Sequence, residues 1–527
     1  MTSRAQSVQT SSGTDRARAG GDPGRRQSQP LSHLGRLPSG SFGYEEARHL
    51  LWRAGFGGTP SQIQALVSMG VERAVDHIVD YERVAFERPG AEDFDSEIMR
   101  PPTEEERRRY RAALQSQDED VVARFRLRRQ EQQRADRAQV REMRRWWLAR
   151  MVETPRPLEE KMTLFWHGHF ATGYRKIENS YHVYMQNQFF RANATGNFGR
   201  LLRGIIRDPA MLAYLDNQRS NRRRPNENLA RELMELFSLG VGNYTENDIK
   251  EGARALTGYS FEHNEFVFDE QAHDRGTKRI LGRRGAIDGD GFVDAILARR
   301  ACAEFIAARL YSFFVADLPA DVREIDRETR SFVGRLATVI AQSNYELKPA
   351  LKRLFRSDHF YHAGFRNDKI KSPAELVVGA VRSLLTPARD LNLLADAMGL
   401  MGQELFQPPS VRGWPGGRTW INTSTLFVRQ NALAYLLTGV PAGRGRRDTA
   451  AFDATGVLAE LERAEPGASN DPERLAPYLL RATLGRRTPE AERIIASFIA
   501  ENGGRPTNDM LTGVLLLATA MPEYQLC

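Results

Sequence analysis

The stretch "PNENLARELMELFSLGVGNYTENDIKEGARALTGY", residues 225–259, shows how this chain folds. Leu229, Leu233 and Phe237 recur every four residues, a spacing that places apolar side chains on one face of an α-helix. Thr245 follows a turn and precedes acidic residues, which is the pattern of a helix N-terminus. The stretch therefore predicts a helix that packs on a core, followed by the start of a second helix.

The same helical spacing extends outward along most of the chain. The segments that read as helical are 104–151, 157–260, 292–440 and 451–527. Residues 259–285 instead alternate polar and apolar positions and contain several aromatic residues, which predicts a small β-hairpin. We therefore predict a mainly α fold. It consists of one large helical body, 43–527, with a small β-hairpin and a protruding charged helical segment, 104–150, whose base is anchored by Trp146 and Trp147.

Two similar stretches lie near opposite ends of this body. "HLLWRAGFGGTPSQIQALV" (49–67) is similar to "YLLRATLGRRTPEAERIIA" (478–496). Both read as a helix, a glycine-containing turn and a helix that begins at Thr-Pro. Two separated copies do not make a solenoid, which needs regular tandem repeats. We expect the two stretches to pack against each other and close the fold.

The length, composition and charge of the chain limit which class of protein it can be. The chain has 527 residues, of which 41% are hydrophobic and 27% charged, and its net charge is +8. Residues 1–42 carry six arginines against Asp15 and Asp22, so this tail holds half of the excess charge. The distribution argues against a nucleic-acid-binding face on the folded body. Because the tail is also rich in Ser, Gly and Pro, it is predicted to be disordered.

Several classes of protein are excluded by what the sequence lacks. Two cysteines cannot form a disulfide framework or a cysteine zinc site. The sequence contains no G-x-S-x-G elbow, no phosphate-binding P-loop and no H-E-x-x-H motif. It also has no run of 18 apolar residues, so no transmembrane helix is expected. Without a visible secretory signal, a cytoplasmic location is expected for the sequence as written, and export if translation begins further upstream.

The first candidate site is "LFWHGHFAT", residues 164–172, in which a single glycine separates His167 from His169. The pair suggests metal ligands, acid–base groups or buried structural histidines. A continuous helix would direct the two rings to nearly opposite sides. They would share one ion only if Gly168 ended the helix or the segment were extended.

The second candidate site consists of carboxylates. Glu232 and Glu235 border the apolar stripe of the central helix, where a carboxylate is costly unless it meets a cation, a donor or a cavity. They are candidate ligands or bases, and the alternative is pairing with arginines such as Arg254 or Arg191. Asp216, which opens the loop before this helix, is a further candidate ligand or base, or a cap.

Further candidates lie on predicted loops. His273 and Asp274, in "HDRGTKRILG", are candidates for acid–base chemistry. Lys278 and Arg231 are candidate partners of an anion, although Arg231 also has the spacing of a surface ion pair with Glu227. In "GWPGGRTWIN", Trp414 and Trp420 flank a tight turn and would either stack on a ring or sugar or fold against the core.

Together these motifs resemble a bacterial family known as domain of unknown function 1800. The resemblance covers roughly residues 44–527. It implies a large, mainly helical protein, often encoded beside a sulfatase-like partner family. Members often carry export signals, and this sequence departs from them in showing none. The motifs that carry the resemblance include "LLWRAGFGGTP", "PLEEKMTLFWHGHFAT", "DPAMLAYLDN", "PNENLARELMELFSLGVGNYTENDIKEGARALTGY", "HDRGTKRILG" and "MGQELFQPPSVRGWPGGRTWINTSTL".

Two functions are consistent with these candidates. The first is an enzyme that performs metal-assisted hydrolysis or oxidation on a small molecule or polymer. Its pocket would be built from residues 164–172, 216–235 and 273–274, with zinc, manganese or iron as the divalent metal. The second is a non-catalytic scaffold or secretion-associated binding protein. The enzyme predicts histidines and carboxylates that converge in one cavity, whereas the binding protein predicts dispersed and paired side chains.

Overall fold

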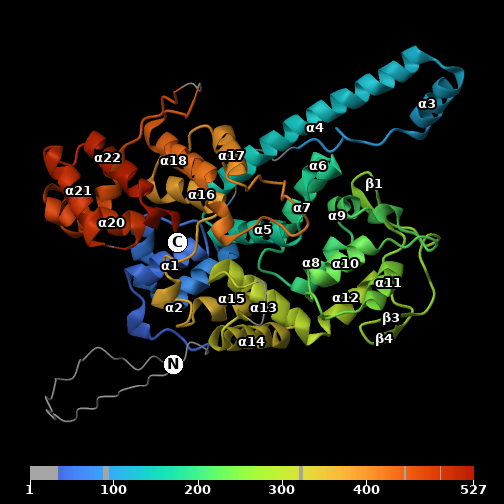
Figure 1. The fold of residues 1–527 in the computed structure, drawn as a ribbon, viewed down its shortest axis with the longest axis horizontal. Helices are drawn as coiled ribbons and strands as arrows, with labels where there is room; N and C mark the ends of the chain where they lie inside the picture. The colour runs from blue at the N-terminus through green and yellow to red at the C-terminus, as the bar shows by residue number, and fades with distance from the viewer. Residues whose placement is uncertain (1–33, 87–93, 320–323, 444–446, 487) are drawn as a thin grey trace, which may run out of the picture.

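The computed structural model describes residues 34–86, 94–319, 324–443, 447–486 and 488–527 (Figure 1). The described residues are 63% helical and form 22 α-helices and two small antiparallel sheets of two strands each. The predicted mainly α fold is therefore confirmed. No helix in the described ranges has both the length and the apolar character needed to cross a bilayer.

The quoted stretch forms two helices, as its apolar spacing predicts. Helix α10 (Glu227–Glu235) buries Leu229 and Leu233, and helix α11 (Glu246–Ala255) packs against it. Thr245 caps α11: its hydroxyl accepts from the amide of Asp248, and the Asp248 carboxylate accepts from the amide of Thr245. Local patterning thus defines both helices before any long-range contact is considered.

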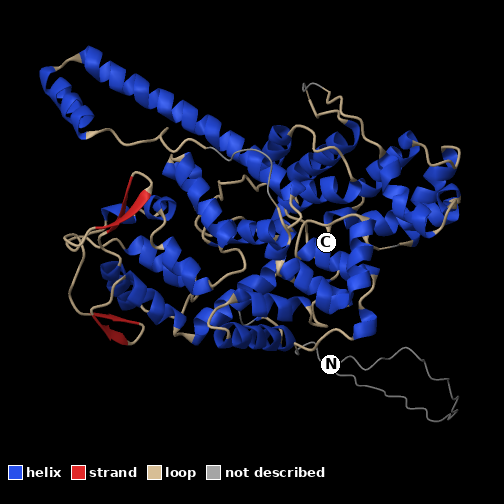
Figure 2. Cartoon of the chain, turned by 180° about the vertical axis from the view of Figure 1, so that it is seen from behind, coloured by secondary structure: helices blue, strands red, loops and turns tan. Residues whose placement is uncertain are grey.

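The segment 259–285 forms two hairpins where the sequence predicted one. Strands β1 (Tyr259–Glu262) and β2 (Glu265–Phe268) pair with Tyr259 opposite Phe268. Strands β3 (Lys278–Ile280) and β4 (Arg283–Gly285) form the second pair (Figure 2). The loop between them contains "HDRG" and divides the segment, because the Asp274 carboxylate accepts from Arg254 and the Asp274 amide donates to the Thr257 hydroxyl rather than to a strand.

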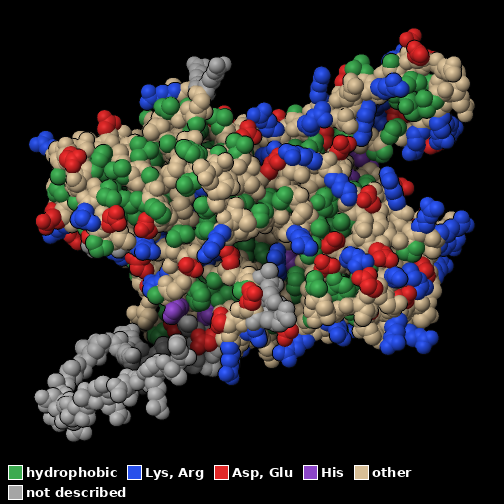
Figure 3. Space-filling model, in the orientation of Figure 1, with side chains coloured by type: hydrophobic (Ala, Val, Ile, Leu, Met, Phe, Trp, Pro, Cys, Tyr) green, Lys and Arg blue, Asp and Glu red, His purple; other side chains and the backbone are tan. Residues whose placement is uncertain are grey.

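A helical arm projects from the body. It consists of α3 (Glu104–Ser116) and α4 (Glu119–Glu153), which pack side by side in opposite directions (Figures 1 and 2). Arginine side chains gather along its length (Figure 3). At the base of the arm Trp146 and Trp147 are buried, and the Trp147 indole Nε1 donates to Glu160 at 2.9 Å. The predicted protruding segment and its tryptophan anchor are both present.

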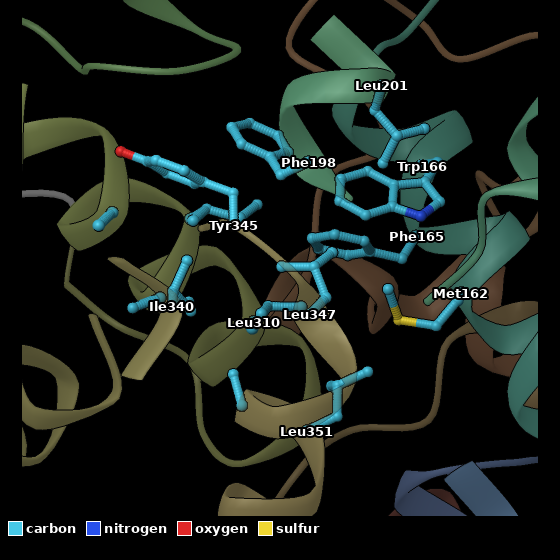
Figure 4. Close-up of a cluster of buried hydrophobic side chains, with 14 of the residues drawn as sticks. Met162, Phe165, Trp166, Phe198, Leu201, Leu310, Ile340, Tyr345, Leu347 and Leu351 are labelled. Carbon is cyan, nitrogen blue, oxygen red and sulfur yellow. The ribbon is translucent and has the colours of Figure 1, made fainter. Parts of the chain in front are cut away.

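One hydrophobic core joins the middle of the chain. In it Met162, Phe165 and Trp166 of α5 meet side chains from helices α8, α13, α14 and α15 (Figure 4). The helices that contribute include α1 (Tyr44–Arg53), α2 (Pro60–Val79), α5 (Pro157–His169), α8 (Phe198–Ile205), α9 (Pro209–Tyr214), α10, α11, α12 (Gly289–Leu297), α13 (Arg300–Phe314), α14 (Arg327–Gln342) and α15 (Leu347–Phe355).

A second core lies beneath the C-terminal helices and the base of the arm. Most of its side chains come from α4, α16 (Pro373–Leu384), α17 (Leu391–Leu400), α18 (Thr423–Thr438), α19 (Ala459–Ala464), α20 (Pro472–Leu484), α21 (Pro489–Glu501) and α22 (Asn508–Ala520), and α5 adds Leu164. Helix α7 (Ser180–Ala192) contributes to both cores, Phe190 to the first and Val183 to the second. The short helix α6 (Tyr174–Ile177) places Tyr174 in the second core.

The two similar stretches near the ends of the body lie against each other. Helix α1 (Tyr44–Arg53) contacts α20: the Arg48 guanidinium donates to the Thr483 carbonyl at 3.1 Å. The Arg481 guanidinium lies 4.0 Å from the centre of the Tyr44 ring. These contacts bring the helices of the two stretches together, although Tyr44 and Arg48 come just before the first stretch.

The boundary predicted for the N-terminal tail is wrong for its last residues. Residues 1–33 lie outside the described residues. Residues 34–42, which were expected to be disordered, pack on the body through Leu34, Leu37 and Phe42, all of them buried. The Leu37 amide donates to the Arg356 carbonyl at 2.9 Å. Three apolar residues spaced through a polar segment are enough to hold it on the core.

Candidate functional site

Helix α5 runs without a break through Gly168, so His167 and His169 point to different sides. His167 is buried and accepts a hydrogen bond at Nε2 from the Asn187 side chain at 2.9 Å. Its ring packs against Trp147, with ring centres 4.7 Å apart. His167 is therefore enclosed between α5, α7 and the base of the arm.

His169 lies in a separate aromatic environment. Its ring stacks on Phe165 at 5.7 Å and packs against the edge of Phe170 at 4.6 Å, and its Nε2 donates to the Phe237 carbonyl at 2.9 Å. Burial, together with the smaller effect of nearby arginines, lowers the pKa of both His167 and His169 to about 3. Both rings are consequently neutral at physiological pH.

The metal site predicted to be shared by His167 and His169 is incompatible with this arrangement. Two imidazoles on opposite sides of one helix cannot bind the same ion, because the glycine between them does not end the helix. Within the described residues, no group of three or more His, Cys, Asp or Glu side chains is placed to hold a metal. The helical geometry thus favours the structural role of both histidines.

Glu232 and Glu235 lie on the same edge of α10 but have different surroundings. Glu235 accepts a hydrogen bond from the Tyr244 hydroxyl at 2.8 Å. Glu232 is half-buried, and its pKa is raised first by burial and then by the neighbouring Glu235. The arginines considered as their partners are engaged elsewhere, Arg254 with Asp274 and Arg191 with Glu160.

Asp216 and Arg231 both belong to surface ion pairs. Asp216 binds Lys176 at 3.1 Å, and 46% of its side chain is exposed. Arg231 binds Glu227 at 3.2 Å and Glu246 at 2.9 Å, as the spacing of Glu227 and Arg231 predicted. Exposed pairs of this kind contribute little to stability and do not form a pocket.

His273, Asp274 and Lys278 form a network that fixes their loop. Asp274 accepts from both sides of the Arg254 guanidinium, which lowers the pKa of this carboxyl. His273 Nδ1 donates to the Thr257 carbonyl at 2.8 Å. The Lys278 ammonium is buried against the Asp274 and Gly276 carbonyls. These groups satisfy one another, so the structure gives them a role in holding the loop.

The residues predicted to form one pocket are therefore dispersed over the molecule. Of the candidate residues, only Trp414 and its neighbour Trp420 line the main cleft of the described structure. This cleft has a volume of about 730 Å³ and lies between α5, α13, the segment 369–375 and the loop 414–420. The face drawn in Figure 3 is hollowed near its centre. The volume is in the range of pockets that hold small organic ligands.

Aromatic side chains supply much of the wall of the cleft. Phe165 and Phe313 pack with their ring centres 5.0 Å apart, and Trp414 and Trp420 contribute from the opposite loop. The loop lies directly on α5, since a Cβ added at Gly413 would stand only 2.0 Å from the Gly168 carbonyl oxygen. Glycine at 413, which has φ of 86°, thus permits the close approach that places Trp414 over the helix.

The charged residues of the cleft are unequally paired. Lys161 is bound to Glu375, whose pKa falls to about 2 beside this ammonium despite its burial. Lys369 is bound to Asp317 at 2.5 Å. Arg309 and Arg418 also line the cleft and have no acidic partner among the described residues. The cleft therefore carries an excess of positive charge.

Arg309 is the most unusual of these side chains. It projects from α13, and its Nε is buried without a hydrogen-bond partner among the described residues. Burial lowers the pKa of Arg309, and no carboxylate in the described ranges offsets this effect. The side chain is partly exposed to the cleft, and a cation that is partly withdrawn from water without a counter-charge is costly to the folded state. The arrangement is thus one that an anion in the cleft would stabilise.

The cleft also contains an amide side chain, Gln403, and two basic side chains, Lys371 and Arg429, lie behind it. Gln403 accepts at Oε1 from the Ala374 amide at 2.8 Å, which leaves its NH₂ group without an acceptor in the described structure. Behind the cleft, Lys371 donates to the Tyr524 carbonyl at 2.7 Å and Arg429 to the Lys371 carbonyl at 2.8 Å. Burial lowers the pKa of both groups, that of Arg429 to about 10, so the positive charge of the cleft is assigned to the residues that line it.

The sequence did not single out Arg309, because an arginine on a mostly apolar helix has no motif around it. That Arg309 has no carboxylate partner can be recognised only in the folded structure, where α5, α13 and the loop 414–420 come together. The one available signal was "GWPGGRTW", whose glycines and tryptophans indicated a loop that closely approaches another element.

A protein family matches the chain along almost its whole length. It is described as "Protein of unknown function (DUF1800)", and the match covers residues 49–526. No curated protein and no solved structure matches the chain. Because the matched range includes every helix from the last turns of α1 to α22, and all the residues of the cleft, the chain belongs to the DUF1800 family.

Proposed function

We propose that this chain is a binding protein whose cleft holds a small organic anion with a flat or apolar portion. The observation that carries this proposal is the uncompensated Arg309 in a cleft walled by aromatic rings. It corresponds to the non-catalytic function that the sequence left open. In support, the candidate histidines and carboxylates are dispersed and are largely held by partners of their own.

The chemistry of the cleft selects the ligand. A guanidinium binds carboxylate or phosphate oxygens through two parallel hydrogen bonds, and it does so most strongly where water is excluded. Phe165, Phe313 and Trp414 offer flat apolar surface to the remainder of the ligand. Aryl carboxylates and aryl phosphates combine both features, so they are the ligand class that we propose.

Calorimetric titration with benzoate and phenyl phosphate tests the proposal, with benzyl alcohol as the neutral analogue. We expect both anions to bind and the alcohol to bind at least tenfold more weakly. Arg309→Gln should weaken the anions by about tenfold or more, which corresponds to about 1.4 kcal/mol. Arg309→Lys keeps the charge and should lose less affinity.

The matched control is Arg222→Gln, which removes the same charge from an exposed loop outside the cleft. It should leave the affinity for both anions unchanged. Equal affinities in the Arg309→Gln and Arg222→Gln variants would overturn the proposal, as would the absence of heat of binding with either anion. Far-ultraviolet circular dichroism of each variant establishes that it is folded before the titrations are compared.

A further inference from the structure

The projecting arm concentrates positive charge at a distance from the cleft. Residues 104–150 contain 14 arginines and nine acidic residues. Acidic side chains near the start of α3 bind some of these arginines, as in the pairs Arg107–Glu104 and Arg128–Glu106. The remaining arginines give the arm an excess of positive charge, although exposed acidic side chains also lie on it (Figure 3).

Five of these arginines form a ridge along α4. They are Arg126, Arg134, Arg137, Arg141 and Arg145, all of them exposed, and they define what we call the arginine ridge. At the rotation of an α-helix they fall within about 100° of its circumference and span about 28 Å of its length. Within the described residues only Arg141 has an acidic partner, Asp396 at 3.6 Å.

Exposed apolar side chains lie at the outer end of the arm. Leu114 is 51% exposed and Leu127 is 56% exposed, although most apolar side chains of the arm are used to pack α3 on α4. A shallow pocket of about 190 Å³ lies nearby, where Phe125 is surrounded by Arg109, Arg124 and Arg128. The tip therefore combines cations with accessible apolar surface.

We propose that the arm is a docking surface for a partner protein that presents an acidic, partly apolar segment. Asp and Glu side chains of the partner would pair with the guanidinium groups of the arginine ridge, and apolar side chains between them would cover Leu127, which borders the ridge. This function is independent of the cleft, because none of the ridge residues lines it.

The observations favour a protein over other polyanions. The ridge is convex and carries no exposed aromatic residue on which a nucleic-acid base would stack. A bilayer would require a broad apolar face, and Val122 and Ala113, which would contribute to one, are buried between α3 and α4. An acidic helix with interspersed apolar residues matches both the charge and the leucines.

The test is fluorescence anisotropy with a labelled helical peptide of about 20 residues made of glutamate and leucine, which matches the length of the ridge. The Arg126→Gln/Arg134→Gln/Arg137→Gln variant of the full chain should bind it at least tenfold more weakly than the unmodified protein. Arg222→Gln/Arg223→Gln/Arg224→Gln removes the same number of charges from another exposed loop and should lose less than twofold.

Two further measurements decide the class of partner. Leu127→Ser should weaken the leucine-containing peptide several-fold and leave the binding of poly-glutamate unchanged. The proposal is overturned if both triple variants lose affinity equally, or if the peptide does not bind at all. It is also overturned if a duplex DNA of about 20 base pairs or a phosphatidylglycerol vesicle binds the ridge more tightly than the peptide at physiological salt.

Discussion

At the scale of single residues, buried side chains decide what this protein can do. His167 and His169 resemble ligands in the sequence, yet each occupies its own aromatic pocket with one hydrogen-bond partner. Helical geometry predicted from the sequence that the rings would diverge unless Gly168 ended the helix. Glycine has a low helix propensity, but packing of α5 on both sides outweighs a local cost of about 1 kcal/mol.

The two histidines make stability depend on pH. Their pKa values are about 3 in the folded chain against about 6.5 when unfolded, so below about pH 6.5 the unfolded chain binds more protons. Stability is fully present above that pH and should fall by about 1.4 kcal/mol per pH unit and per histidine as the pH drops towards 3. Urea unfolding at several pH values checks this. His169→Gln should reduce the slope, and His77→Gln, at an exposed position, should not.

The buried pair Lys161–Glu375 supports a second prediction. Glu375→Gln leaves the Lys161 ammonium without its carboxylate at a fully buried position, so it should cost about 3–5 kcal/mol of unfolding free energy. Glu227→Gln, in an exposed pair, should cost less than about 0.5 kcal/mol. Denaturant titration of both variants makes the comparison. Similar losses would show that Lys161 is solvated through the cleft.

At the scale of elements, periodicity predicted α10, α11 and the arm, because an apolar stripe and an N-cap are local properties of the sequence. The division of 259–285 into two hairpins was not predicted, because it depends on Arg254, a residue on another element that binds Asp274. The cleft was missed for the same reason. Its lining residues are spread along the sequence from Lys161 to Trp420, and only the folded structure shows which of their charged side chains pair.

The arm should be less stable locally than the helices at its base. Ala113 and Val122 are the buried apolar residues of its outer part, whereas Val140, Met143 and Trp147 are buried at its base. Amide hydrogen exchange read by mass spectrometry should show residues 104–130 exchanging well before 140–153. Helix α5, buried along most of its length, serves as the slow reference. Uniform protection from the tip of the arm to its base would contradict this prediction.

At the scale of the whole molecule, two cores are joined by α5, α7 and the pairing of α1 with α20. Composition predicted a large helical body, but the tail was predicted to extend to residue 42, whereas the packed structure already includes residues 34–42. The mean composition of the segment does not reveal three separate apolar residues that pack on the core. Leu34, Leu37 and Phe42 extend the first core by one segment.

A chain that begins at residue 43 should therefore be less stable than one that begins at residue 34. Each of the three buried side chains contributes about 1.5–3 kcal/mol when fully buried, so the loss should reach several kcal/mol. Thermal unfolding of the two chains, prepared in parallel, measures the difference. Equal melting temperatures would mean that the contact of the Leu37 amide with the Arg356 carbonyl is not maintained in solution.

The pairing of Tyr44 and Arg48 with Arg481 and Thr483 also has a consequence in time. On the ribosome α1 emerges more than 400 residues before α20 exists. At about 5–20 residues per second, that interval is roughly 20–90 seconds. During this interval the Arg48 guanidinium lacks the Thr483 carbonyl, and the face of α1 that will pack on α20 is uncovered. The nascent chain must therefore remain soluble while the packing of α1 is incomplete, and this packing is completed only when α20 has been synthesised.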